Sequence, residues 1–149
     1  MSGLSELETV VIEQRCTRLV NQFALLNDAS DFEALVALFT EDGVFARPTV
    51  PDKPMVGRET ILAQFKLRPP RTLRHLMANV TITPISPELA TGVCYMILYV
   101  GPPAEPGQAG PPKADATALI GSFEDTFVKV GDEWLFSKRQ GSLGLSVGG

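Results

Sequence analysis

Residues 91–100, TGVCYMILYV, decide the fold class of this chain because they form an unbroken apolar run of strand composition. β-Branched and aromatic side chains favour extended backbone, and the run is far shorter than the ~20 residues of a membrane-spanning helix. In a strand, Tyr95 and Tyr99 fall on one face, whereas Met96 and Leu98 fall on the other. The stretch therefore predicts one long strand of a sheet.

The segments around this strand have the same character. Residues 72–85 are rich in β-branched side chains, and residues 115–130 and 133–142 are joined by Gly131-Asp132, which is typical of a tight hairpin turn. Residues 101–112, GPPAEPGQAGPP, predict an exposed loop that reaches residue 113. We expect about four long antiparallel strands, followed by a flexible tail over residues 143–149.

The first half of the chain shows helical periodicity instead. Residues 5–26 carry apolar side chains three or four positions apart, which share one helix face. Ser30 opens a capping-box pattern, SDFE, for a second helix that ends near Thr40, and Gly57-Arg58-Glu59 opens a third. Helices followed by strands indicate an α+β fold with the helices on one face of an antiparallel sheet. We expect residues 1–149 to form one domain.

Composition argues against several classes of protein. The formal net charge is −4, and the arginines Arg68, Arg71 and Arg74 are expected to be solvated, so neither nucleic acid nor a membrane is an expected partner. Two cysteines without a CxxC motif and a single histidine favour neither a disulfide nor a metal site. The acidic N-terminus lacks an apolar signal core, which favours a cytoplasmic location. The motifs of phosphate loops, α/β-hydrolases and zinc proteases do not occur.

Several local motifs, in a fixed order along nearly the whole chain, resemble a known family. Together they are similar to the SnoaL-like branch of the nuclear transport factor 2-like superfamily, the branch that contains scytalone dehydratase. The matching stretches are FALLNDASD (23–31), LFTEDGVF (38–45), Gly57-Arg58-Glu59 with Ile61, RHLMANVTI (74–82), and Gly131-Asp132-Glu133-Trp134 with Arg139.

This resemblance implies a cone-shaped fold in which three N-terminal helices pack on a highly curved antiparallel sheet around an apolar pocket. It places Asp28 and His75 at the positions of a catalytic acid–base pair that needs no cofactor and no metal. Phe23 stands where the family often has a tyrosine, so this chain lacks that hydroxyl. A second pocket histidine, which scytalone dehydratase uses, has no counterpart here.

The residues themselves leave alternatives open. His75 lies in a strand pattern, where it could either fill a half-buried position or carry protons, since histidine titrates near neutral pH. Asp28 could be a solvent-facing turn residue or the carboxylate that orients His75, and Asp31 is expected in the first turn of the second helix. Arg139 is a candidate partner for the mid-strand carboxylates Glu124 and Asp125. The candidate pocket residues are Phe23, Asn79, Tyr95, Tyr99, Phe45 and Phe65.

Two functions follow from these patterns. The first is a lyase, in particular a dehydratase, or an isomerase that acts on a small apolar molecule bearing a carbonyl or hydroxyl group. The alternative is a non-catalytic domain that binds a small ligand or a partner, or a small-subunit-like partner of an aromatic-ring dioxygenase; the missing tyrosine and the single histidine favour it. In both cases the apolar strand predicts a homodimer, because short helices cannot cover so much apolar surface.

Overall fold

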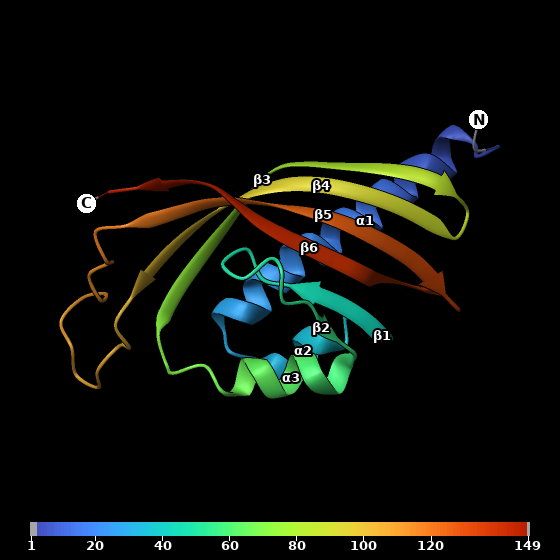
Figure 1. The fold of residues 1–149 in the computed structure, drawn as a ribbon. Coiled ribbons are helices and arrows are strands. Elements are labelled where there is room, and N and C mark those ends of the chain that lie inside the picture. The colour runs from blue at the N-terminus through green and yellow to red at the C-terminus, as the bar shows by residue number, and fades with distance from the viewer. Residues whose placement is uncertain (1–2, 149) are drawn as a thin grey trace.

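The computed structural model describes residues 3–148 and shows helices packed on one six-stranded sheet. Its long strands curve across the molecule, and the helices lie on the concave side (Figure 1). The α+β class and the curved sheet predicted from the sequence are therefore confirmed. The elements are α1 (Glu6–Asp28), α2 (Phe32–Val36), β1 (Phe39–Ala46), β2 (Met55–Val56), α3 (Arg58–Lys66), β3 (Thr72–Ser86), β4 (Leu89–Gly101), β5 (Ala118–Val130) and β6 (Glu133–Val147).

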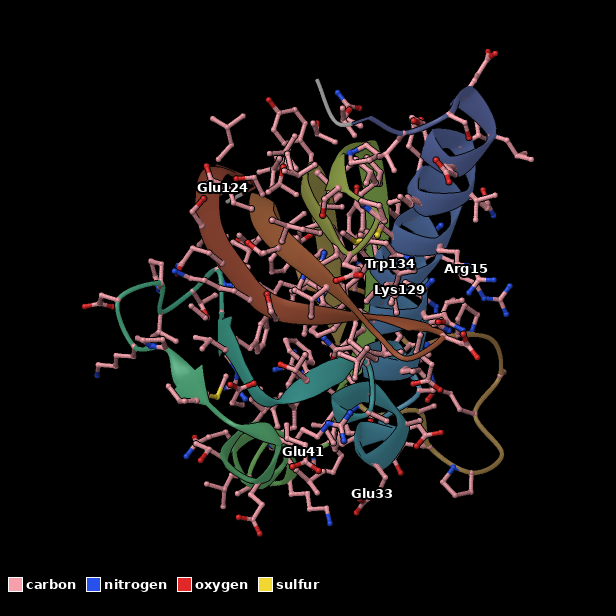
Figure 2. All side chains as sticks on the ribbon, turned by 90° about the vertical axis from the view of Figure 1, so that its right-hand side faces the viewer. Arg15, Glu33, Glu41, Glu124, Lys129 and Trp134 are labelled. Carbon is pink, nitrogen blue, oxygen red and sulfur yellow. The ribbon has the colours of Figure 1, made fainter. Side chains whose placement is uncertain are left out.

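The long helix α1 begins at a complete capping box. The Ser5 side chain accepts a hydrogen bond from the Glu8 backbone N–H, and the Glu8 carboxylate accepts one from the Ser5 N–H. At mid-helix, Arg15 donates a hydrogen bond to the backbone carbonyl of Asp132 in the β5–β6 turn (3.1 Å), close to the buried Trp134 (Figure 2). The helix is thereby attached to the far end of the hairpin.

The second helix differs from its prediction at both ends. Asp31, not Ser30, is its N-cap and accepts a hydrogen bond from the Ala34 N–H, while Ser30 adopts φ 57° in the connecting turn. The helix ends at Val36, and Phe39 already starts β1. Phe39 is fully buried and pairs with Phe136 of β6, so tertiary packing outweighs the helical pattern of the sequence.

The sheet order is β2-β1-β6-β5-β4-β3. All neighbouring strands are antiparallel except β1 and β6, which run parallel; neither this pairing nor the short β2 was anticipated. The predicted flexible tail is wrong for its first five residues, because β6 continues to Val147 and pairs with the start of β5. Gly149 lies outside the described residues. The predicted loop over residues 101–113 is exposed except at Gly101, which ends β4 and is buried, and at Pro112, which is half-buried.

Aromatic rings form the centre of the core on the concave side. Phe23 is 3% exposed, and five other phenylalanine rings lie within 6.4 Å of its centroid. Phe45 and Phe65 stack with an interplanar angle of 12°. Four of these six rings, those of Phe23, Phe45, Phe65 and Phe123, form the floor of the candidate functional site.

Candidate functional site

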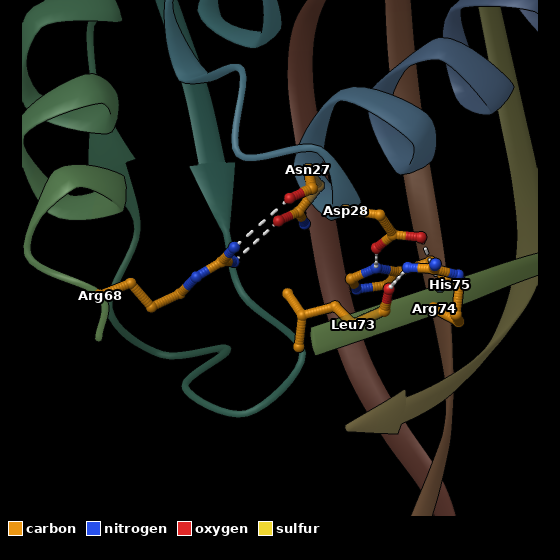
Figure 3. Close-up of polar contacts among 6 residues, drawn as sticks. All are labelled: Asn27, Asp28, Arg68, Leu73, Arg74 and His75. Carbon is orange, nitrogen blue, oxygen red and sulfur yellow. Dashed lines mark hydrogen bonds and ion pairs between the residues drawn. The ribbon is translucent and has the colours of Figure 1, made fainter. Parts of the chain in front are cut away.

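Asp28 and His75 meet through two hydrogen bonds, although 47 residues separate them in the sequence. Asp28 Oδ1 lies 2.6 Å from His75 Nδ1, and Asp28 Oδ2 accepts a hydrogen bond of 2.9 Å from the His75 backbone N–H (Figure 3). Both side chains are 11% exposed. One carboxylate thus holds both the backbone and the imidazole of the same residue.

Helix α1 and strand β3 position this pair. Asp28 is the last residue of α1, and α1 packs along β3. His75 lies near the start of β3, as its fourth residue. A carboxylate can only accept hydrogen bonds, so His75 Nδ1 carries the proton that Asp28 accepts. The other ring nitrogen, Nε2, then has its lone pair free to accept a proton.

His75 borders a cavity of about 210 Å³ between the sheet and the helices. Most of its lining is apolar, and its polar side chains are three arginines, Asn27, Thr49 and His75. The lining residues are Phe23, Asn27, Phe45, Arg47, Pro48, Thr49, Phe65, Arg68, Arg71, Leu73, His75, Met96, Leu98, Leu119 and Phe123. Such a hollow suits a small, mainly apolar molecule with a polar group.

Half of the predicted pocket residues line this cavity. Phe23, Phe45 and Phe65 do so. Tyr95 and Tyr99 do not: their side chains are 56% and 46% exposed on the convex face, because Met96 and Leu98 take the inward positions of β4.

Asn79 is also misplaced by the sequence pattern. The two-residue period of a regular strand would put this candidate pocket residue on the same face as His75, but β3 bulges between Ala78 and Thr81, and Asn79 adopts φ 55° there. A bulge adds one residue to a strand and shifts the following side chains to the other face. Asn79 is exposed as a result.

Sequence reasoning missed the arginines of the cavity rim. Arg68 was expected to be solvated, yet it is half-buried and donates a hydrogen bond of 2.7 Å to the Asn27 side chain (Figure 3). Arg47 is half-buried as well and donates to the Gln64 carbonyl (3.2 Å). Burial lowers the pKa of both guanidinium groups, and the charge of Arg47 lowers that of Arg68 further. Each arginine directly precedes a proline, Pro48 or Pro69, and proline indicates a loop, so the sequence pattern gives no sign of their burial.

A second carboxylate–cation pair lies deeper, in the core of the sheet. Arg139 Nε donates to Asp125 Oδ1 at 3.0 Å, and the two side chains are 0% and 1% exposed. The guanidinium also lies over the rings of Phe23, Phe123 and Phe136, at 3.9 to 4.8 Å from their centroids. Burial raises the pKa of Asp125 to about 6, although Arg139 acts in the opposite direction. The expected partner of Arg139 is therefore Asp125, while Glu124 is exposed.

Neither a cluster of metal-ligating side chains nor a membrane-spanning helix is found among residues 3–148. Among residues 3–148, histidine, cysteine and acidic side chains nowhere gather in a group of three that could ligate a metal. In the same range, every helix is too short or too polar to cross a bilayer. Cys16 and Cys94 are both buried free thiols, and burial raises the pKa of Cys16 to about 12.

Helices on a curved sheet, enclosing an apolar cavity with an imidazole–carboxylate pair at its wall, define the class of small α+β cavity proteins. Within it, the chain belongs to the SnoaL-like domain family, whose model matches residues 9–140. No curated protein is significantly similar to it in sequence.

Solved structures with this fold support the same assignment. A Novosphingobium aromaticivorans protein named "Putative Scytalone Dehydratase" superposes with a TM-score of 0.76 at 21% identity, over 94% of this chain and 89% of the other. A hexachlorocyclohexane dehydrochlorinase of type 2 gives 0.79 at 14% identity, over 97% and 93%. ActVI-ORFA from Streptomyces coelicolor gives 0.71 at 19%, over 89% and 96%. At these identities the likeness shows the fold.

Proposed function

We propose that this protein is a cofactor-independent lyase that removes water from a small molecule bearing a carbonyl group and a β-hydroxyl group. The observation that carries the proposal is the double hydrogen bond from His75 to Asp28 at the cavity wall. It fixes the imidazole in the tautomer that offers Nε2 as a base. Two similar structures bear the names of a dehydratase and a dehydrochlorinase, and elimination is the reaction that these names share.

The reaction needs one proton carrier. His75 Nε2 takes the proton from the carbon next to the carbonyl, and the electrons of that C–H bond form an enolate. The enolate then forms the C=C bond while the β-carbon–oxygen bond breaks. The departing oxygen takes the proton back from Nε2 and leaves as water, so the imidazole returns to its neutral form. Asp28 stabilises the imidazolium between these steps. Isomerisation of a ketone shares the first step and differs in where the proton returns.

The test uses the aldol adduct of benzaldehyde and acetone, whose dehydration product, benzalacetone, absorbs strongly in the ultraviolet. His75→Gln keeps an amide donor for Asp28 but has no basic nitrogen, so its turnover should fall by about 10²–10⁴. Arg74→Gln is the matched control, because Arg74 is an exposed neighbour on β3 outside the cavity lining. Absence of turnover by the wild type across such β-hydroxy ketones, with and without a para-carboxylate on the ring, refutes the proposal, and so does turnover by His75→Gln within a few-fold of the wild type.

A binding domain without catalysis is the second candidate, and Phe23 is the observation that favours it. The ring is buried among other phenylalanines, so the position where the family often has a hydroxyl supplies no donor to the cavity. In that case benzalacetone and related ketones would bind in calorimetry, the aldol adduct would persist, and His75→Gln would bind as tightly as the wild type.

A second copy of this chain is the partner that we propose for the convex face. Leu76, Val93, Tyr95 and Tyr99 share that face of β3 and β4, and each is between 46% and 56% exposed. Apolar side chains gathered on one face favour association. Sedimentation of the wild type should give a dimer, and Tyr95→Lys should give a monomer of unchanged helix content; a monomeric wild type at micromolar concentration contradicts this.

A further inference from the structure

We infer that the substrate or ligand of this cavity carries a carboxylate, which Arg47 and Arg68 bind at the rim while its apolar body lies on the phenylalanine floor. The inference rests on the proposed function only in taking this cavity as the site of binding.

Two half-buried cations of the cavity rim, Arg47 and Arg68, share one ring. The Cζ atoms of Arg47 and Arg68 lie 5.3 and 5.4 Å from the centroid of Phe65. Among residues 3–148, neither guanidinium forms an ion pair with a carboxylate, in contrast to Arg71, which pairs with Asp115 at 2.7 Å. Partly burying two unpaired like charges around one ring is costly, and a bound anion would offset that cost.

Both guanidinium groups have N–H donors that their present hydrogen bonds do not use. Arg68 uses Nη1 and Nη2 on the Asn27 side chain and carbonyl (2.7 and 3.5 Å), and Arg47 uses only Nη2. A guanidinium has five N–H donors arranged for planar carboxylates, so both side chains retain capacity. Asn27 is 5% exposed, and it directly precedes Asp28, so consecutive residues of α1 bind Arg68 and His75.

The charged side chains that line the cavity are positive. The cavity lining contains Arg47, Arg68 and Arg71 and no carboxylate. Asp28 interacts favourably with Arg68, but its two oxygens are engaged by His75, and Asp115 neutralises Arg71. The rim thus keeps an excess positive charge on a chain whose formal net charge is −4. A localised field of this kind selects anions.

The experiment compares two ligands that differ only in charge: benzalacetone with a para-carboxylate and benzalacetone with a para-carboxamide. Calorimetry measures their binding to the wild type without any turnover. The carboxylate should bind at least about tenfold more tightly, since charge-assisted hydrogen bonds are about twice as strong as neutral ones. Its affinity should fall with added sodium chloride, and that of the carboxamide should not.

Variants assign the effect to the two arginines. Arg47→Gln and Arg68→Gln should each remove most of the preference for the carboxylate, whereas Arg74→Gln, the same change at an exposed site on β3, should preserve it. The salt response of the wild type provides the answer without any variant should one of them fail to fold. Equal affinities for the two ligands, or no binding of the carboxylate at millimolar concentration, would overturn the inference. Neither result depends on dehydration, so the proposed lyase activity stands or fails separately.

Discussion

Two carboxylate–cation pairs lie on the concave side of the same sheet, and they differ in depth and in partner. Asp28–His75 is 11% exposed beside the cavity, and an imidazole can both take up and release a proton. Asp125–Arg139 is at most 1% exposed under three rings, and its guanidinium stays charged. The first arrangement suits proton transfer, whereas the second suits a buried ion pair that stabilises the fold. Burial and partner, more than the presence of a carboxylate, therefore separate a reactive pair from a structural one.

Removing the deep cation should produce the largest change in stability. Arg139→Met keeps apolar contacts with the rings but leaves Asp125 buried without its cation, so the free energy of unfolding should drop by about 3–5 kcal/mol. Lys138→Met, an exposed neighbour on β6, is the control and should change it by about 0.5 kcal/mol at most. Urea denaturation measures both. If the free energy of unfolding of Arg139→Met falls by less than about 1 kcal/mol, the pair does not stabilise the fold.

The deep pair should also give a pH signature of its own. The pKa of Asp125 is raised to about 6 in the folded protein, so the folded state binds this proton more tightly than the unfolded state does. The corresponding stability is present below about pH 4 and is lost as the pH rises through about 6.

The measurement is the difference in unfolding free energy between the wild type and Asp125→Asn at several pH values. That difference should fall by about 1–3 kcal/mol, in favour of the variant, between pH 4 and pH 7. A difference that is constant, or that grows with pH, would contradict the raised pKa.

The shallow pair should respond in turnover more than in stability. Asp28 accepts hydrogen bonds from two groups of His75, the backbone N–H and the ring Nδ1–H. In Asp28→Asn the amide oxygen can accept from only one of them, and the amide N–H₂ faces the other, so the imidazole loses its fixed tautomer. Dehydration of the aldol adduct should slow by about tenfold or more. The matched change Asp31→Asn, at the N-cap of α2, keeps a capping oxygen and should leave turnover unaltered. Equal rates for both variants would remove Asp28 from the mechanism.

The helices and the long strands could be predicted from the sequence, because hydrophobic periodicity is a local property of the chain. The meeting of Asp28 with His75 could be predicted only from the resemblance to the family, whose motifs occur in the same order. Prediction from the sequence failed at Asn79, where a bulge interrupts the two-residue period, and at Tyr95 and Tyr99, because an apolar strand gives no sign of which face is inside. It also missed the rim arginines. Arg47 and Arg68 stand next to proline-rich loops and meet at Phe65 only in the folded chain.

The central claim is that Asp28 fixes the proton of His75 on Nδ1 and leaves Nε2 as the base. Nitrogen-15 NMR of the single histidine measures this directly on the wild-type protein, above the pH at which the ring loses its charge. The account predicts a protonated Nδ1 with a downfield proton shared with a carboxylate, and a bare Nε2. A neutral ring with its proton on Nε2, in a folded protein, would contradict it.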